Sequence, residues 1–331
     1  MTDTAEPLHE SSSREGALSH EGPPPRDRGS VPDDVLAAVR RIQLRASRVV
    51  NDVLAGHYHS TFRGAGMEFD EVRVYTPGDD VRTIDWNVTA RTGVPHIKRF
   101  VEERELTVQL LVDVSASAEF GSVQRTRGEV AAELCALLAL AAISNQDKVG
   151  LVMFGAEIER HVPPKKGKRH VLRVIREVLL HESRRGATQI AAALAYASRA
   201  QRRHSTLFLV SDFLVGDAEW QDVKTALRVA SQRHDVIAVT LEDPRELELR
   251  AAGLVELRDL ETGERRLIDS SSRRVRAVYA EQAQQRRGAR TELFRRLGVD
   301  EVVVDIGGDW VEPLVRFFQR RERRARRRGG G

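Results

Sequence analysis

Cysteine is almost absent from this sequence. Among 331 residues the only cysteine is Cys135, so no disulfide can form within the chain. A chain without disulfides fits a reducing compartment. Cys135 lies inside an apolar run, where we expect it to be buried as a small hydrophobic residue.

Long hydrophobic runs are also missing. A membrane-spanning helix needs about 20 consecutive apolar residues, and no such run occurs. The first residues lack the basic and then apolar pattern of a secretory signal peptide. We therefore expect no transmembrane segment and a cytoplasmic location.

The body of the chain has no excess of charge of either sign. The net charge of +4 hides two opposite ends: residues 1–30 contain three arginines and six acids, whereas residues 316–331 contain eight arginines and one glutamate. The arginine run of residues 320–328 could attract nucleic acid or an anionic membrane. It lacks interleaved aromatic residues and a recognisable nucleic-acid-binding fold. We therefore expect a solvated helix end that frays.

Apolar runs of strand length alternate with longer amphipathic runs from residue 107 onward. The runs predict strands at 108–113, 149–154, 206–210, 236–241 and 302–304, and helices at 127–146, 169–181, 190–200, 219–233, 273–297 and 310–320. They also predict a short strand near 158–161, a loop at 163–169 and a hairpin at 254–269. Alternation of this kind predicts an α/β fold with a doubly wound, mostly parallel sheet flanked by helices.

Composition divides the chain into five parts. Residues 1–30 are rich in Ser, Pro, Gly and acids and are expected to be disordered. Residues 31–105 combine an N-terminal helix with a small loop- and β-rich module, and residues 106–245 form the core of the sheet. Residues 246–319 supply the hairpin, the long helix, the last strand and the last helix, and residues 320–331 are a basic tail.

Oxygen-bearing side chains follow the first strand of the predicted sheet. Asp113 ends the apolar run, and Ser115 and Ser117 follow at two-residue spacing. Ligands bind at the carboxyl ends of the strands in open α/β sheets. One carboxylate and two hydroxyls are hard donors that suit a divalent cation. Ser and Asp at a strand end are also common turn formers, so this trio alone supports either interpretation.

Two later segments supply matching side chains. Thr188 lies just before the apolar-periodic run 190–200, at the start of a predicted helix, and Asp212 follows the strand at 206–210. The topology of an α/β sheet would bring both residues beside the first trio. The candidate metal site therefore consists of Asp113, Ser115, Ser117, Thr188 and Asp212. Mg²⁺ is the expected ion, with Mn²⁺ or Ca²⁺ as alternatives.

The pattern D-x-S-x-S, then Thr, then Asp resembles the metal-ion-dependent adhesion site of von Willebrand factor type A domains. A longer resemblance, from about Val39 to Phe318, is to the proteins of domain-of-unknown-function family 58. The segment GAGMEFDEVRVYTPGDDVRTIDWNVTARTGVPHIKRFVEERELTVQLLVDVSAS is similar to the signature of that family. One departure is Ala118, where the family often has Met, at a position that is not a ligand.

The resemblance implies a von Willebrand factor type A domain that acts as an adaptor or chaperone-like partner of other proteins. Members of the family commonly accompany MoxR-type AAA+ ATPases, so an ATPase of that type is the expected partner. We expect the partner to donate a carboxylate to the bound metal. The helix N-terminus beside Thr188 would favour that anion.

Motifs of the common hydrolases and phosphotransferases are absent. The sequence contains no G-x-S-x-G elbow, Walker A loop or H-E-x-x-H helix, and no second Asp lies two residues after Asp113. We therefore expect no enzymatic activity. Two alternatives stay open: a metal-dependent hydrolase or phosphatase that uses Asp113, and a nucleic-acid-binding protein that uses the arginine tail.

Residues 68–91 interleave acids, arginines and aromatic residues. We expect short strands at 71–75 and 97–102, and an ion-pair network that holds this module to the main sheet. The members of the network would be Arg73, Asp79, Asp80, Arg82, Asp85 and Arg91. Trp86 is the expected buried anchor of the module, so Trp86→Ala would cost about 3–5 kcal/mol.

Overall fold

The computed structural model describes residues 67–102, 106–122, 125–181, 186–258 and 263–328, together with Arg40, Leu44 and Tyr58. Within these residues, no helix has both the length and the apolar composition needed to cross a membrane. The segment 1–30, expected to be disordered, lies outside the described residues, as does nearly all of the helix expected after residue 31.

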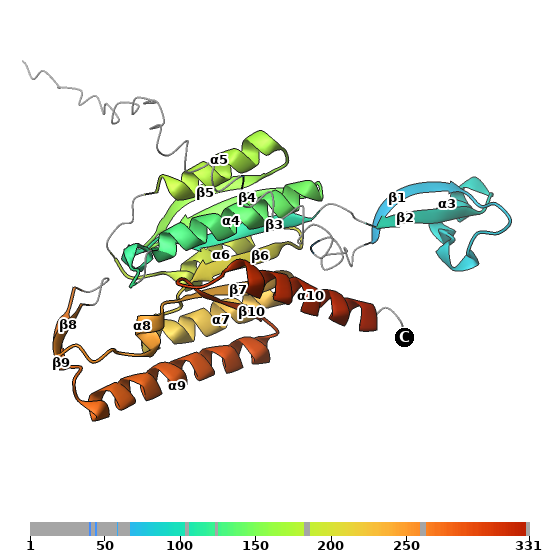
Figure 1. The fold of residues 1–331 in the computed structure, drawn as a ribbon. Helices are drawn as coiled ribbons and strands as arrows, with labels where there is room; N and C mark the ends of the chain where they lie inside the picture. The colour runs from blue at the N-terminus through green and yellow to red at the C-terminus, as the bar shows by residue number, and fades with distance from the viewer. Residues whose placement is uncertain are drawn as a thin grey trace, which may run out of the picture.

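A six-stranded sheet forms the centre of the protein (Figure 1). In spatial order its strands are β10 (Asp300–Asp305), β7 (Asp235–Glu242), β6 (Thr206–Ser211), β3 (Thr107–Asp113), β4 (Lys148–Phe154) and β5 (Ile158–Lys165). Every neighbouring pair is parallel except β4 and β5. The strand order reverses between β3 and β6, and such a switch point leaves a crevice for ligands at the carboxyl ends of the strands. The α/β fold predicted from the sequence is confirmed.

Helices cover both faces of this sheet and give three layers (Figure 1). The first face carries α4 (Arg127–Ser144), α5 (Lys168–Leu179) and α10 (Val311–Arg328), and the second carries α6 (Ile190–Ala200), α7 (Asp217–Arg233) and α9 (Arg273–Leu297). Side chains alternate along each strand, so Leu110 and Val112 of β3 join the core on the first face and Leu111 joins the core on the second. Because both faces are covered, the central strands are almost continuously apolar.

The helix α4 illustrates how the sequence positions these elements. It begins at a capping box, in which the Glu129 amide donates to the Thr126 hydroxyl and the Thr126 amide donates to the Glu129 carboxylate. Its remaining sequence is apolar on nearly all sides, as expected for a helix buried within a core. Cys135 lies in this helix and is fully buried, which confirms the expectation for the single cysteine.

The C-terminal segment completes the same sheet. β10 pairs with β7, so the residues after 245 contribute a strand to the main fold. The predicted hairpin is confirmed as β8 (Leu254–Arg258) and β9 (Arg265–Asp269), and the predicted long helix as α9. Buried Arg290 of α9 donates to Glu242 of β7 at 2.6 Å and to Glu301 of β10 at 2.8 Å. These two contacts tie α9 to the edge of the sheet.

Two elements are longer than the sequence predicts. β5 continues to Lys165 through Pro163 and Pro164, where the sequence predicts a loop. Proline is tolerated there because β5 is an edge strand, whose outer N–H groups have no partner strand. α10 continues to Arg328 through the residues assigned to a basic tail.

The module at residues 67–102 is separate from the sheet and extends away from it (Figure 1). The two short strands expected here are present as β1 (Met67–Val74) and β2 (His96–Glu102), which pair antiparallel and enclose a 3-10 turn (Val81–Thr83) and the short helix α3 (Trp86–Thr92). The ion pairs described here, Arg73–Asp79 at 2.6 Å and Asp85–Lys98 at 3.2 Å, lie within the module. The expected network between the module and the main sheet is therefore wrong for the described residues.

Trp86 does not anchor this module. Its residue is 71% exposed at the first turn of α3. The prediction of a buried Trp86 is wrong, because the segment forms a helix whose first turn faces solvent.

Candidate functional site

Asp113 joins the two strands at the switch point of the sheet. It is the last residue of β3 and is 7% exposed. Its Oδ2 accepts a hydrogen bond from the Ser211 hydroxyl of β6 at 2.7 Å, and its Oδ1 accepts one from the Ser115 amide at 3.0 Å. The carboxylate is therefore oriented by both β3 and β6. Sequence reasoning did not single out Ser211, although it directly precedes Asp212.

Ser115 and Ser117 lie together beside this carboxylate. Their hydroxyl oxygens are 3.1 Å apart, and Ser115 is fully buried. The backbone turns here into a short 3-10 helix, η3 (Ala116–Glu119), which begins at the Ser115 cap. Two hydroxyls and one carboxylate therefore converge on the same turn after β3, as the sequence predicts.

The loop that carries Thr188 reaches the same edge of the sheet. Thr188 is buried, and the next residue, Gln189, donates its amide to the carbonyl of Gly155 at 2.9 Å. Gly155 in turn lies against Ser115, because a Cβ on this glycine would stand 3.6 Å from the Ser115 Cα. Thr188 is thus one loop away from Ser115, two residues before α6 begins.

Asp212 is already engaged by a residue that the sequence reasoning missed. Its Oδ1 accepts from the Leu214 amide at 3.0 Å, and its Oδ2 lies 3.0 Å from the guanidinium of Arg127. Arg127 is the first residue of α4 and is 3% exposed. It also pairs with Glu246 of α8 (Pro244–Leu247) and donates to the Ser117 carbonyl at 3.2 Å. A cation at a helix N-terminus opposes the helix dipole, and that mismatch is the signal that could have revealed Arg127.

Burial and charge change the titration of this cluster. Burial, followed by the negative charge of Asp212, raises the pKa of Asp113 to about 7, although hydrogen bonds from Ser211 and Ser115 oppose the shift. Burial also raises the pKa of Glu246, against the opposing effect of Arg127. Burial lowers the pKa of Arg127, but Asp212 and Glu246 outweigh it and raise that pKa above its usual value. Arg127 therefore stays charged, whereas Asp113 has no cation of its own among the described side chains.

The donors at this edge fit a hard divalent cation. All of them are oxygens, and the raised pKa of Asp113 indicates a carboxylate whose charge lacks compensation. The candidate oxygen donors here are Asp113, Ser115, Ser117, Thr188 and Asp212, and Arg127 offsets part of the charge of Asp212. No group of three or more His, Cys, Asp or Glu side chains suited to a metal occurs in the described part of the chain. A metal here would therefore depend on the hydroxyls.

The match to a family model decides the classification of the chain. The model described as protein of unknown function DUF58 matches residues 71–289. This chain belongs to the DUF58 family. Its sheet is doubly wound, with the D-x-S-x-S turn at the switch point. An uncharacterized protein of Mycobacterium tuberculosis is 32% identical over 306 residues, which cover 92% of the DUF58 chain and 95% of the relative. An uncharacterized protein of Mycobacterium avium is also 32% identical, over 41% of this chain and 78% of that protein.

Several solved structures resemble parts of the DUF58 chain. The conserved hypothetical protein BatB of Bacteroides thetaiotaomicron is 17% identical with a TM-score of 0.44, covering 66% of this chain and 99% of that chain. The VWA domain of SpRpn10 is 11% identical with a TM-score of 0.35, covering 63% and 93%. Manganese-loaded TRAP protein of Plasmodium vivax is 17% identical with a TM-score of 0.29, covering 41% and 57%. At these values none of them bears on the activity of the DUF58 chain.

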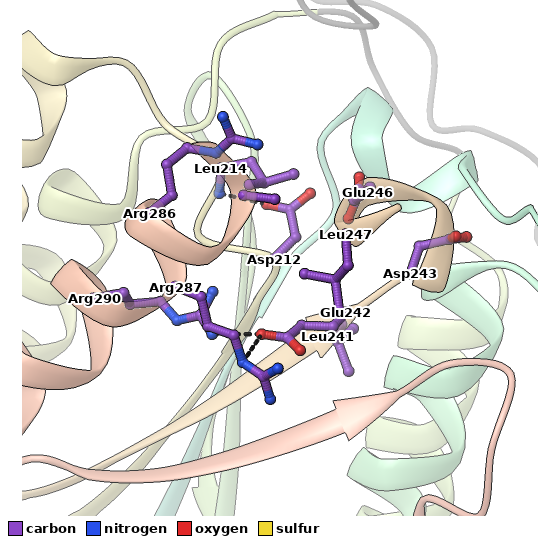
Figure 2. A pocket seen from close by; sticks show the side chains of 11 residues that line it. Asp212, Leu214, Leu241, Glu242, Asp243, Glu246, Leu247, Arg286, Arg287 and Arg290 are labelled. Carbon is purple, nitrogen blue, oxygen red and sulfur yellow. Dashed lines mark hydrogen bonds and ion pairs between the residues drawn. The ribbon is translucent and has the colours of Figure 1, made fainter. Parts of the chain in front are cut away.

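A small pocket lies beside Asp212, between α8 and α9 (Figure 2). Glu242 points across it toward the arginines of α9, whereas the Asp243 carboxylate turns away and accepts from Ser122. Arg287 and Arg290 both pair with Glu242, at 3.3 and 2.6 Å. The pocket holds about 30 Å³, room for a water molecule or two. These ion pairs stabilise the contact between α9 and the DUF58 core. The pocket itself is too small for a ligand.

Proposed function

We propose that this protein is a non-enzymatic adaptor that binds a protein partner through a divalent metal ion. Mg²⁺ is the proposed ion, and Mn²⁺ or Ca²⁺ could replace it. The observation that supports this proposal is the buried cluster at the switch point, where Asp113, Ser115 and Ser117 converge without a cation on Asp113. Thr188 and Asp212 complete the proposed set.

The chemistry of this set favours an anionic partner. The hydroxyls of Ser115, Ser117 and Thr188 are neutral, and part of the charge of Asp212 is neutralised by Arg127. The protein therefore supplies less than two full negative charges to a divalent ion. A carboxylate from a partner, Asp or Glu, would complete both the charge and the coordination of the site. The start of α6 beside Thr188 adds a favourable dipole for that carboxylate.

The proposed partner is a MoxR-type AAA+ ATPase in the cytoplasm, and the proposed role is assembly or maturation of other proteins. This part of the proposal comes from the resemblance of the signature segment to its family. The chemistry of the site requires only that the partner presents an accessible Asp or Glu.

Two observations favour an adaptor over a hydrolase. In the described part of the chain, no histidine hydrogen-bonds or ion-pairs with Asp113, Ser115 or Ser117. His181 borders the same region, but its Nε2 pairs with Glu159 at 3.0 Å. The Ser115 and Ser117 hydroxyls contact each other, and no described histidine is placed to activate either one as a nucleophile.

A pull-down with the partner ATPase tests the proposal. Wild type and Asp113→Asn are each compared with Mg²⁺ and with EDTA. Asparagine is preferred to alanine because Asp113 is buried and accepts two hydrogen bonds, so alanine would leave the Ser211 hydroxyl and the Ser115 amide without a partner. We expect retention of the ATPase only by wild type with Mg²⁺. Equal retention in all four conditions would contradict the metal bridge and move the contact surface to residues 56–104.

A further inference from the structure

The module at residues 67–102 exposes apolar side chains that its own fold does not use. Trp86 is 71% exposed and Val81 is 61% exposed. Scattered exposed aliphatic residues are normal on a protein surface, but an indole this exposed, close in sequence to a second exposed apolar residue, is typical of an interaction site. The side chains lie on the 3-10 turn and the first turn of α3.

Most of the unpaired charge around these residues is positive. Asp79 pairs with Arg73, and Asp85 caps α3 and pairs with Lys98, whereas Asp80 accepts only from the Arg82 amide. The exposed guanidiniums of Arg82 and Arg91 form no ion pair with any described residue. Trp and Arg are the residue types most enriched among those that dominate binding energy at interfaces. A partner for this surface needs an apolar cavity with an acidic rim.

The main fold of the same chain contains such a cavity. It measures about 370 Å³ and lies between the end of β3, the N-terminal turn of α4 and the end of α5. Val114, Ala131 and Val178 give it an apolar floor, Asp113 of the candidate metal site also lines it, and its rim carries Glu119 and Glu129, both exposed. Glu119 has no hydrogen bond or ion pair within the described residues. A cavity of about 150 Å³ holds a benzene ring, so this one admits an indole.

We infer that the cavity binds the Trp86 surface of a second copy of this chain. Trp86 of one copy inserts between α4 and α5 of the other, and Arg82 and Arg91 face Glu119 and Glu129. If each copy inserts its module into the other, the two contacts are equivalent and form a closed two-fold dimer. The inference goes beyond the proposed function, because this association needs neither a metal ion nor an ATPase.

Light scattering coupled to size-exclusion chromatography, in EDTA over a series of concentrations, measures the association. We expect wild type to approach twice the chain mass of 37.1 kDa as concentration rises. Trp86→Ala and Glu119→Arg should each weaken the dimer by at least about 30-fold, the equivalent of a 2 kcal/mol hot spot. Leu267→Ala is the matched control, because Leu267 is 68% exposed on β9, outside both surfaces.

Mixing the two variants separates the proposed contact from other causes of dissociation. The Trp86→Ala chain keeps an intact cavity, and the Glu119→Arg chain keeps an intact Trp86 surface. A mixed dimer has one intact contact, whereas the homodimer of either variant has none, so the mixture should associate more tightly than either variant alone. Circular dichroism melting of each variant checks that both are folded, as expected for substitutions at exposed positions.

Several results would overturn this inference. The first is that wild type stays monomeric up to its solubility limit. The second is that Trp86→Ala or Glu119→Arg dimerises as tightly as wild type. The third is that mixing the two variants does not recover association. Because the measurement is made in EDTA without an ATPase, its failure would leave the metal-dependent adaptor function unaffected.

Discussion

Asp113 is a buried carboxylate that has no ion pair among the described residues. It lies at the junction of β3 and β6 with Asp212 nearby, and the guanidinium of Arg127 pairs with Asp212 and Glu246 instead. Burying an uncompensated charge is unfavourable. The fold retains this arrangement at the place where α/β sheets bind ligands, and this is why we regard it as a functional site.

The raised pKa of Asp113 predicts an unusual dependence of stability on pH. An Asp titrates near 3.9 in the unfolded chain and near 7 in the metal-free fold, so the folded state binds the proton more tightly. The free energy of unfolding should therefore decrease as pH rises from about 4 to about 7. Asp113→Asn removes this contribution. Urea unfolding in EDTA across that pH range measures the free energy of unfolding of both proteins. Parallel pH profiles of that free energy for wild type and Asp113→Asn would contradict the prediction.

Arg127 should be among the most sensitive residues for stability. Arg127→Gln would leave Asp212 and Glu246 buried without their cation, and removing one partner of a buried ion pair costs about 3–5 kcal/mol. Denaturant unfolding measures the loss. Arg295→Gln is the matched control, because Arg295 is 73% exposed and pairs only with Glu292 on the same helix; it should change stability by less than about 0.5 kcal/mol. Similar midpoints for the two variants would show that the Arg127 pairs contribute little.

Among the elements, α10 departs most from what its sequence suggests. The arginine run predicts a solvated tail, because no large apolar residue follows Phe318. In the structure Arg321 stacks on Phe317, with 5.6 Å between the guanidinium carbon and the ring centroid, and pairs with Asp235 and Asp300. These acids begin strands β7 and β10. The long side chain thus reaches across to the sheet, a contact that local composition cannot reveal.

Two truncations test the contribution of α10. Deleting residues 325–331 removes the last turn of α10 but no described side-chain ion pair or ring contact, so it should leave the melting temperature unchanged within error. Deleting residues 321–331 also removes the pairs of Arg321 and Arg324 with Asp235 and Asp300. It should cost about 1–2 kcal/mol, since the pairs are partly exposed. Equal melting temperatures for the two truncations would mean that these arginines do not stabilise the fold.

Trp86 and Trp310 differ greatly in exposure, so substituting each one tests how much its burial contributes to stability. Trp86 is 71% exposed and Trp310 is 1% exposed. Trp86→Ala should change the free energy of unfolding by less than about 0.5 kcal/mol, whereas Trp310→Ala should cost about 3–5 kcal/mol. Chemical denaturation of both variants makes the comparison. A large loss in Trp86→Ala would restore the interpretation of Trp86 as an anchor.

The elements that sequence predicted well are those whose signals are local. The apolar runs predicted β3, β4, β6 and β7, and the Ser272 cap and the Gly298 terminator enclose α9 at the predicted bounds. The extension of β5 through its prolines was missed, because it depends on which strand lies at the edge. The helix α3 was missed because its Asp85 cap lies in a segment whose charges suggested a loop.

At the scale of the whole molecule, the sheet order explains both the success and the limit of the site prediction. Strand ends that carry Asp113 and Asp212 are distant in sequence, but parallel topology brings them to one switch point. Arg127 could not be found this way, because its two carboxylate partners lie after β6 and on α8, which only the finished sheet brings to the start of α4.

Binding of Mn²⁺, followed by electron paramagnetic resonance of the free ion, tests the central claim most directly. Wild type is compared with the double variant Ser115→Ala, Ser117→Ala and with Ser231→Ala as a control, because Ser231 lies on α7 and bonds only to the Arg228 carbonyl of the same helix. We predict one bound ion per chain in wild type and control, displaced by excess Mg²⁺, and loss of binding in the double variant. Equal binding by all three proteins would contradict the metal site and the adaptor function built on it.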